Sequence, residues 1–274
     1  MAIKKNSPLG TQTCYPKSYN PTLLFPIPRK KGRDSIGIKK NIKFYGVDIW
    51  NAYEVSWLDS KGKPLVATAQ ISFQCDTKNI IESKSLKLYL NSMNQMKFES
   101  KDEILSFIKN DISKCAEGNV KIILTELKDL YEQGFSSFSG LLLDDLDITV
   151  DSYDPNPFLL AAKKDAGPIS ETLYSHLLKT NCPVTNQPDW ASIMIRYTGQ
   201  PIDKICLLRY IISYRNQQDY HEQCVERIYS DIFAYCAPIE LEVYARYTRR
   251  GGLDINPYRS SKKIDPPLIR ISRQ

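Results

Sequence analysis

The chain has 274 residues, of which 42% are hydrophobic and 25% charged, and its formal net charge is +6. This composition predicts a globular protein with a substantial core, arranged as one large domain or two of ordinary size. The small positive excess suits an anionic ligand such as a nucleotide phosphate, but it falls short of a composition typical of nucleic-acid-binding proteins.

Hydropathy and cysteine usage indicate the cellular compartment of the protein. No apolar run approaches the length of a membrane span, and the first residues lack the apolar stretch of a signal peptide. The seven cysteines are dispersed, odd in number and without a CxxC pair, which argues against a disulfide framework and against a zinc finger. We therefore expect a cytoplasmic protein with reduced thiols, no membrane contact and no metal site.

The first half of the chain predicts an arm followed by one module. Residues 1–45 are rich in proline, glycine and lysine, and the basic cluster at 29–33 favours a solvated arm over a nucleic-acid contact. Residues 53–73 predict two strands joined at 60–63, because polar and apolar residues alternate. Helices are expected at 80–91 and at 100–116, the second with a capping box, and a strand at 119–130. The first module is assigned to 46–150.

The second half predicts a related module. Residues 151–168 contain prolines and little periodicity, which indicates a linker or crossover, and the linker is assigned to 151–180. A strand at 190–197, helices at 204–215 and 220–236, and a strand at 240–249 then predict a module over 181–274. The expected fold class is α+β, with two tandem modules that each pair a small antiparallel sheet with two helices.

Cys182 and Asp189 are candidates for covalent chemistry. Pro183 disfavours helix at Cys182 and predicts an exposed, extended turn. A thiol becomes a strong nucleophile when a cation or a helix N-terminus lowers its pKa, but a small buried hydrophobic role is equally compatible with the sequence. Asp189, just before the expected strand, is either a turn residue or an acid whose pKa burial would raise.

His221 and Glu222 stand near the start of the helix at 220–236. Adjacent helix positions point in different directions, so the two side chains would meet a ligand from different angles. A carboxylate is the natural acceptor for two neighbouring donors, such as the N1–H and 2-amino edge of a guanine-like ring. Surface or packing roles remain the alternative.

Two further segments could bind an anionic cofactor. Residues 82–85 place Glu82, Ser83, Lys84 and Ser85 at a helix start, where backbone N–H groups bind anions. Arginines and glycines at 249–252 suit close approach to a phosphate. A solvated helix and a basic strand end are the alternatives, and no GxGxxG or P-loop is present.

Four stretches in order resemble the long, two-module form of the 7-cyano-7-deazaguanine reductases, the nitrile reductases of queuosine biosynthesis. They are 82–89 (ESKSLKLY), 181–190 (NCPVTNQPDW), 221–228 (HEQCVERI) and 244–257 (YARYTRRGGLDINP), with GVDIW at 46–50 besides. The resemblance covers nearly the whole chain and departs only in the linker and the terminal arms.

The resemblance implies a tunnelling fold, a homodimeric assembly and a covalent mechanism. It assigns Cys182 as the nucleophile that forms a thioimide with the nitrile, and Asp189 as the proton donor. Substrate binding falls to Glu82, Ser83, Lys84, His221 and Glu222, and contacts with NADPH to Lys84, Ser85, Arg250 and Gly251. No direct nucleic-acid partner is expected.

Three other functions stay open. A zinc-dependent pterin enzyme related to GTP cyclohydrolase would need a Cys/His cluster, and the chain has only two histidines. An amidohydrolase would use Cys182, His221 and Asp189 without NADPH. A non-catalytic purine-binding scaffold would bind its ligand unchanged.

Overall fold

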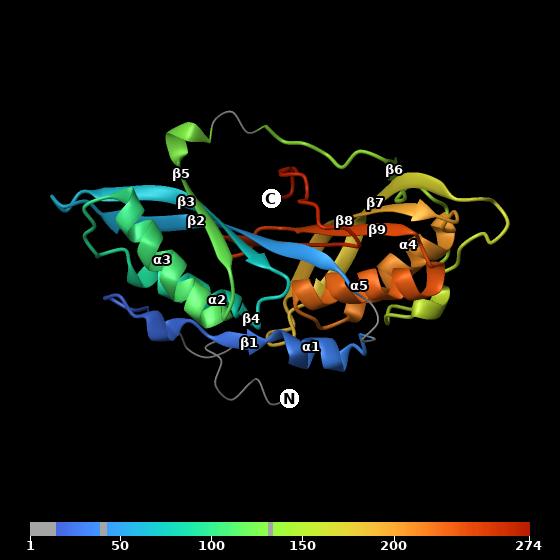
Figure 1. The fold of residues 1–274 in the computed structure, drawn as a ribbon, viewed down its shortest axis with the longest axis horizontal. Helices are drawn as coiled ribbons and strands as arrows, with labels where there is room; N and C mark the ends of the chain where they lie inside the picture. The colour runs from blue at the N-terminus through green and yellow to red at the C-terminus, as the bar shows by residue number, and fades with distance from the viewer. Residues whose placement is uncertain (1–14, 39–42, 131–133) are drawn as a thin grey trace. The chain divides into compact units, whose positions relative to one another are not determined.

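The computed structural model describes residues 15–38, 43–130 and 134–274, and the chain divides into two compact units (Figure 1). Of the described residues, unit 1 comprises 15–31, 48–130, 134 and 249–255, and unit 2 comprises 32–38, 43–47, 135–248 and 256–274. Both units are mixed α+β, and their strands pair mainly antiparallel, which confirms the predicted fold class at this level.

Unit 1 is built on a sheet in which β3 lies between β2 and β5. Strands β3 and β5 pair antiparallel, and β1 pairs with β4 in a separate two-stranded sheet. The elements are β1 (Pro26–Pro28), β2 (Tyr45–Leu58), β3 (Pro64–Gln74), β4 (Asn79–Ile81), α2 (Ser83–Ser92), α3 (Lys101–Ala116) and β5 (Val120–Glu126), with short 3-10 helices at Pro21–Leu23 and Leu127–Asp129.

The alternation in β3 determines which face of this sheet is buried. Ala67, Ala69, Ile71 and Phe73 are at most 2% exposed and pack in one core with residues of α2 and α3, which lie along one face of the strands (Figure 1). The predicted capping of α3 is confirmed, because the Ser100 hydroxyl accepts from the Glu103 N–H at 3.2 Å.

Helix α2 begins later than the periodicity indicates. The expected helix at 80–91 is wrong at its first residues, since Ile80 and Ile81 pair with Ile27 and Pro26 in the β1–β4 sheet. Glu82 is the N-cap, and the helix starts at Ser83. The consequence is that the whole 82–85 segment lies at a helix N-terminus.

Unit 2 has the strand order β10-β9-β8-β7-β6, antiparallel except that β6 runs parallel to β7. Its helices pack with these strands in a second core. The elements are β6 (Leu141–Leu142), β7 (Ile169–Asn181), β8 (Pro188–Gly199), α4 (Lys204–Ser213), α5 (His221–Cys236), β9 (Glu240–Tyr247) and β10 (Leu253–Ser260), with 3-10 helices at Pro157–Leu159 and Tyr214–Asn216. Strands β2 and β10 each contribute residues to both units.

Strand β7 lies largely inside the predicted linker. Residues 169–180 of the assigned linker form a strand that pairs along β8 from Ile169↔Gly199 to Asn181↔Pro188. The register shifts between Ser175 and Leu178, and such a bulge breaks the two-residue period by which a strand is detected in sequence. The predicted module boundaries themselves stay a prediction.

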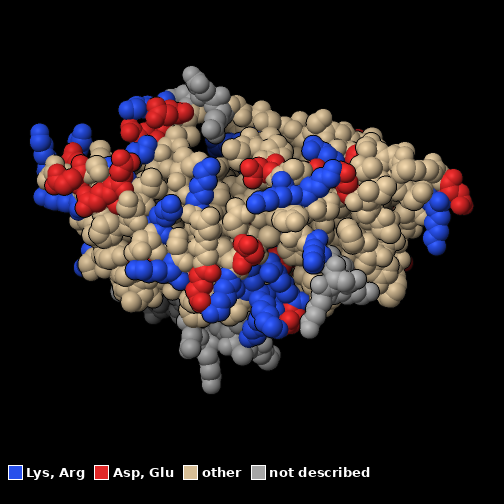
Figure 2. Space-filling model, viewed as in Figure 1, with Lys and Arg blue, Asp and Glu red and all other residues tan. Residues whose placement is uncertain are grey.

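The basic cluster of the N-terminal arm is only partly solvated. The cluster lies in the short helix α1 (Arg29–Ser35), in which Lys30 and Lys31 are exposed. Arg29 is 5% exposed and pairs with the buried Asp48 at 2.6 Å, and Arg33 pairs with Glu226 at 2.8 Å. The solvated-arm prediction is therefore wrong for these two arginines, because buried carboxylates require a cationic partner. On the face drawn in Figure 2, Lys and Arg side chains lie among Asp and Glu side chains.

Candidate functional site

The β7–β8 hairpin of unit 2 holds Cys182 and Asp189 close to each other. Asn181 pairs with Pro188 and Thr180 with Asp189, so residues 182–187 form the connecting loop. Within the loop the Cys182 N–H donates to the Gln187 carbonyl at 2.9 Å, and the Asn186 N–H donates to the Cys182 carbonyl at 3.0 Å. These two bonds fix the backbone that carries the thiol.

The thiol itself is buried. Cys182 is 5% exposed, so the expectation of an exposed turn at this residue is wrong. Pro183 does keep the chain out of a helix, but the loop then folds back on itself, and Asn186 takes a left-handed φ of 59° that closes it. A thiol buried in this way is shielded from water.

Asp189 and His221 meet at the edge of this hairpin. The His221 Nε2 lies 3.3 Å from an Asp189 carboxyl oxygen, and their side chains are 13% and 5% exposed. The segment before α5 is tied to the hairpin, since the Asn181 N–H donates to the Gln217 carbonyl at 2.8 Å and the Gln218 amide donates to the Asn186 side chain at 2.9 Å. The loop at 182–187 and His221 are thus fixed relative to one another.

Tyr247, at the end of β9, is a site residue that sequence reasoning missed. Its ring stacks on the His221 imidazole with the centroids 3.7 Å apart and the planes 7° from parallel. Burial raises the pKa of Tyr247 well above its ordinary value, which keeps the phenol neutral. The only sequence signal was the position of Tyr247 in the 244–257 stretch, whose assigned residues were Arg250 and Gly251.

Glu222 is buried in the first turn of α5, where the helix dipole favours a carboxylate. One turn later, Glu226 accepts hydrogen bonds of 2.8 to 3.1 Å from two guanidinium groups, those of Arg33 and Arg259. Gly32 packs directly against Gln223, because a Cβ on this glycine would lie 1.7 Å from the Gln223 amide nitrogen. The start of α5, with His221 and Glu222, is therefore held in place by several contacts.

In unit 1, Glu82 and Ser85 form the cap of α2. The two Glu82 carboxylate oxygens accept from the Lys84 and Ser85 N–H groups, each at 2.8 Å. Burial raises the pKa of Glu82, and the two backbone hydrogen bonds oppose this rise. The Ser85 hydroxyl donates to the Glu82 carbonyl at 2.6 Å and accepts from the Phe25 N–H. Ser83 and Lys84 are partly exposed beside this cap.

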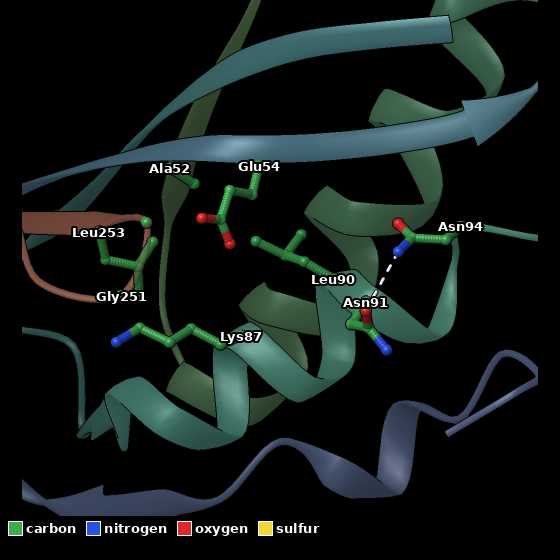
Figure 3. A pocket seen from close by; sticks show the side chains of 9 residues that line it. Ala52, Glu54, Lys87, Leu90, Asn91, Asn94, Gly251 and Leu253 are labelled. Atoms are coloured by element: carbon green, nitrogen blue, oxygen red, sulfur yellow. Dashed lines mark hydrogen bonds between the residues drawn. The ribbon is translucent and has the colours of Figure 1, made fainter. Parts of the chain in front are cut away.

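The tight turn between β9 and β10 brings Arg250 and Gly251 to helix α2. Lys87, in the third helical position after Lys84, donates from Nζ to the Arg250 carbonyl at 2.9 Å. Gly251 and Gly252 have positive φ values of 56° and 76°, the pattern of a two-residue hairpin turn that favours glycine. A pocket of about 100 Å³ lies against this turn, and Figure 3 shows Glu54 and Lys87 on either side of it.

The structure thus gathers the sequence-predicted residues into two groups. Unit 2 holds Cys182, Asp189, His221 and Glu222, and unit 1 holds Glu82, Ser83, Lys84 and Ser85 at the N-terminus of α2, whose Lys87 donates to the Arg250 carbonyl in the Arg250–Gly251 turn of the same unit. Among the described residues, no group of three or more His, Cys, Asp or Glu side chains is arranged to hold a metal ion, and no helix has the length and hydropathy to span a membrane.

Comparisons with known proteins match both parts of the chain. A family model described as "Nitrile reductase, 7-cyano-7-deazaguanine-reductase N-term" matches residues 15–124, and one described as "QueF-like protein" matches residues 188–266. The NADPH-dependent 7-cyano-7-deazaguanine reductase of Cupriavidus metallidurans is 53% identical over 277 residues, covering 100% of both chains. That of Burkholderia multivorans is 52% identical over 98% of this chain and 99% of its own.

Among solved structures, the archaeosine synthase QueF-Like in its apo form matches 37% of this chain and 99% of its own, at 14% identity and a TM-score of 0.30. This likeness is too distant to show a shared fold, whereas the relatives above are similar from end to end.

Proposed function

The chain belongs to the 7-cyano-7-deazaguanine reductase family, and on this premise we propose that it reduces the nitrile of 7-cyano-7-deazaguanine to an aminomethyl group with two NADPH, in queuosine biosynthesis. The observation that carries the proposal is the buried Cys182 on the same hairpin as the Asp189–His221 pair. A nucleophile, a proton-bearing group and a shielded setting are what covalent activation of a nitrile needs.

In the proposed reaction, the S–H bond of Cys182 breaks as its sulfur adds to the nitrile carbon, and the thiol proton passes to the Asp189 carboxylate. The C≡N bond becomes C=N in a covalent thioimide, and the nitrogen takes a proton that Asp189 holds at a carboxyl oxygen. His221, 3.3 Å from that carboxyl group, orients it and returns a proton to it. When the carbon–sulfur bond later breaks, the electron pair goes to Cys182 as a thiolate and an imine remains.

NADPH, when bound, supplies one hydride to the thioimide carbon and a second to the imine. The residues of unit 1 suit such a cofactor, because Lys87 and Arg250 are cationic and meet at a glycine turn, and Lys84 is a further cation one helical turn before Lys87. Glycine at 251 and 252 lets an anionic group approach the backbone closely. We propose Lys84, Ser85, Arg250 and Gly251 as its contacts.

Recognition of the deazaguanine falls in this proposal to Glu222 and His221, with Glu82, Ser83 and Lys84. Glu222 is a buried carboxylate at a helix N-terminus, suited to accept from two ring donors side by side. We also propose that the chain is a tunnelling-fold protein that works as a homodimer in the cytoplasm. These assignments rest on the family resemblance.

The test is an intact-mass measurement after incubation with 7-cyano-7-deazaguanine and no NADPH. We expect the protein mass to rise by one substrate molecule, and the adduct to disappear in Cys182→Ala. The matched control is Cys206→Ala, which removes a partly buried thiol on α4 and should keep the adduct. An unmodified wild-type mass at saturating substrate would overturn the proposal.

The same samples separate the other functions. Addition of NADPH should consume two molecules per nitrile reduced, whereas an amidohydrolase would turn over the substrate with none. A binding scaffold would hold the deazaguanine equally well in Cys182→Ala, without an adduct. Stoichiometric zinc in the purified protein would favour the pterin-enzyme alternative.

A further inference from the structure

Gln274 is a buried residue whose side-chain amide joins two strands of unit 2. Its Nε2 donates to the Tyr247 carbonyl at 3.0 Å and to the Asn256 Oδ1 at 2.6 Å, and its Oε1 accepts from the Arg246 Nε at 2.7 Å. The residue is 7% exposed. Because an arginine nitrogen only donates and a backbone carbonyl only accepts, these partners fix which way the amide points.

The bond to Tyr247 extends the contacts of β9 beyond its pairing with β10. That pairing covers β10 residues 258–260, and the preceding Pro257 has no N–H to donate. On the opposite edge of β9, the Thr248 N–H donates to β8 at 2.9 Å, so the carbonyl of the alternate residue Tyr247 points away from β8. Gln274 therefore holds the end of β9 on the β10 side by a side-chain amide instead of a strand ladder.

The ring of Tyr247 carries this restraint into the site. It stacks on the His221 imidazole with the centroids 3.7 Å apart, and the His221 Nε2 lies 3.3 Å from an Asp189 carboxyl oxygen. Tyr247 is fully buried, so its ring is closely packed and follows the backbone that carries it. A displacement of the Tyr247 backbone would therefore move the imidazole relative to the Asp189 carboxyl group.

Residues 269–274, which we call the tail, are anchored by contacts that do not involve Tyr247. The Ser136 N–H donates to the Arg270 carbonyl at 2.7 Å, and the Arg273 guanidinium donates to the His176 carbonyl at 2.9 Å. Figure 1 shows the tail, near the label C, on the other side of the unit 2 strands from α5. An anchored segment on that side of the strands thus brings the Gln274 amide to β9.

From these contacts we infer that Gln274 is a positioning residue for the Asp189–His221 pair and acts through Tyr247, an inference that rests on the proposed function. Proton transfer to the nitrile nitrogen depends on hydrogen-bond geometry, and a misplacement of about 1 Å is enough to disturb it. The Gln274 amide suits this role because its nitrogen restrains the end of β9 while Arg246 holds its oxygen.

The test measures the rate at which the Cys182 adduct forms with 7-cyano-7-deazaguanine in the absence of NADPH. Gln274→Glu keeps an acceptor for Arg246 but has no N–H to donate to the Tyr247 carbonyl, so the tail stays anchored while the positioning bond is lost. We expect the rate to fall about fivefold, within the range of coupling inside one hydrogen-bond network. Gln274→Met, which removes the amide at similar volume, should show the same fall.

A double-variant cycle separates positioning from general stabilisation. Because the influence of Gln274 passes through the Tyr247 ring, Gln274→Glu combined with Tyr247→Leu should form the adduct within about twofold of the rate of Tyr247→Leu alone. A purely structural role would instead lower the rate of the double variant by the same fivefold again. The matched control is Arg273→Ala, which removes the tail contact with the His176 carbonyl and should keep the rate within about twofold of the wild type.

Three results would overturn the inference. They are an unchanged rate in both Gln274 variants, a further fivefold loss in the double variant, and an equal loss in Arg273→Ala, which would assign the effect to the tail as a whole. Failure of the proposed function looks different. A wild-type protein that forms no adduct loses both proposals, whereas normal wild-type adduct formation with an unaltered rate in the Gln274 variants loses only this one.

Discussion

The buried carboxylate of Glu226 offers the sharpest test of how α5 is held. In the folded chain it pairs with Arg259, whose side chain is 0% exposed, and with Arg33, whose side chain is 28% exposed. Four hydrogen bonds of 2.8 to 3.1 Å join the three side chains. Glu226→Ala removes all four and leaves a guanidinium group buried without its carboxylate.

We expect this substitution to destabilise the protein by about 3–5 kcal/mol, the cost of leaving a buried charge unpaired. For a chain of this length that corresponds to a fall in Tm of roughly 6–20 °C. Arg33→Ala should cost less, about 1–3 kcal/mol, because its side chain is more exposed and Glu226 keeps its second partner. Because Glu226 lies one helical turn after Glu222, the KM for the deazaguanine should rise as well.

The measurement is thermal and urea unfolding followed by circular dichroism and tryptophan fluorescence. Lys128→Ala is the matched control, since the Lys128–Glu126 pair is close, at 2.9 Å, but its side chains are 73% and 45% exposed. An exposed pair of this kind contributes little, so the control should unfold with the wild type. If Glu226→Ala has the same midpoint as Lys128→Ala, the reasoning about the buried triad is refuted.

Three further outcomes are expected. Tyr247→Leu removes the ring stacked on His221 and should lower kcat/KM about 10-fold or more. Tyr247→Phe keeps the ring and should keep most of the activity. Equal losses in the two variants would contradict a stacking role. Burial raises the pKa of Asp219 to about 6 from 3.8, so its contribution to stability is greatest below pH 4 and is lost as the pH rises from about 4 to 6. The free energy of unfolding of Asp219→Asn, taken relative to that of the wild type, should therefore rise by about 3 kcal/mol between pH 4 and pH 7, because one pKa unit corresponds to about 1.36 kcal/mol. A difference in urea midpoints that does not change with pH would contradict this. Gly252→Ala places a Cβ against a carboxyl group at a φ of 76° and should raise the KM for NADPH; Gly37→Ala, at a φ of 67° with nothing within 4 Å, measures the backbone strain alone and should leave that KM unchanged.

Local patterns in the sequence were sufficient for most helices and strands. Helix α3 was found from its spacing and its cap, because both depend on residues within one or two turns of each other. Strands β3, β8 and β9 were found from two-residue alternation for the same reason. Strand β7 was missed because its bulge breaks that alternation, and the start of α2 was misplaced because pairing with a distant strand took Ile80 and Ile81.

The sequence by itself also determined the chemical inventory and the family, since long motifs identify both without coordinates. Only the tertiary structure decided how those residues are used. Cys182 is buried by the folding of its own loop, and the Asp189–His221 contact depends on a strand and a helix meeting. Arg33 reaches Glu226 across 193 residues of sequence. Contacts over such separations leave no periodic trace in a single sequence, because they arise from packing between elements and not from neighbours along the chain.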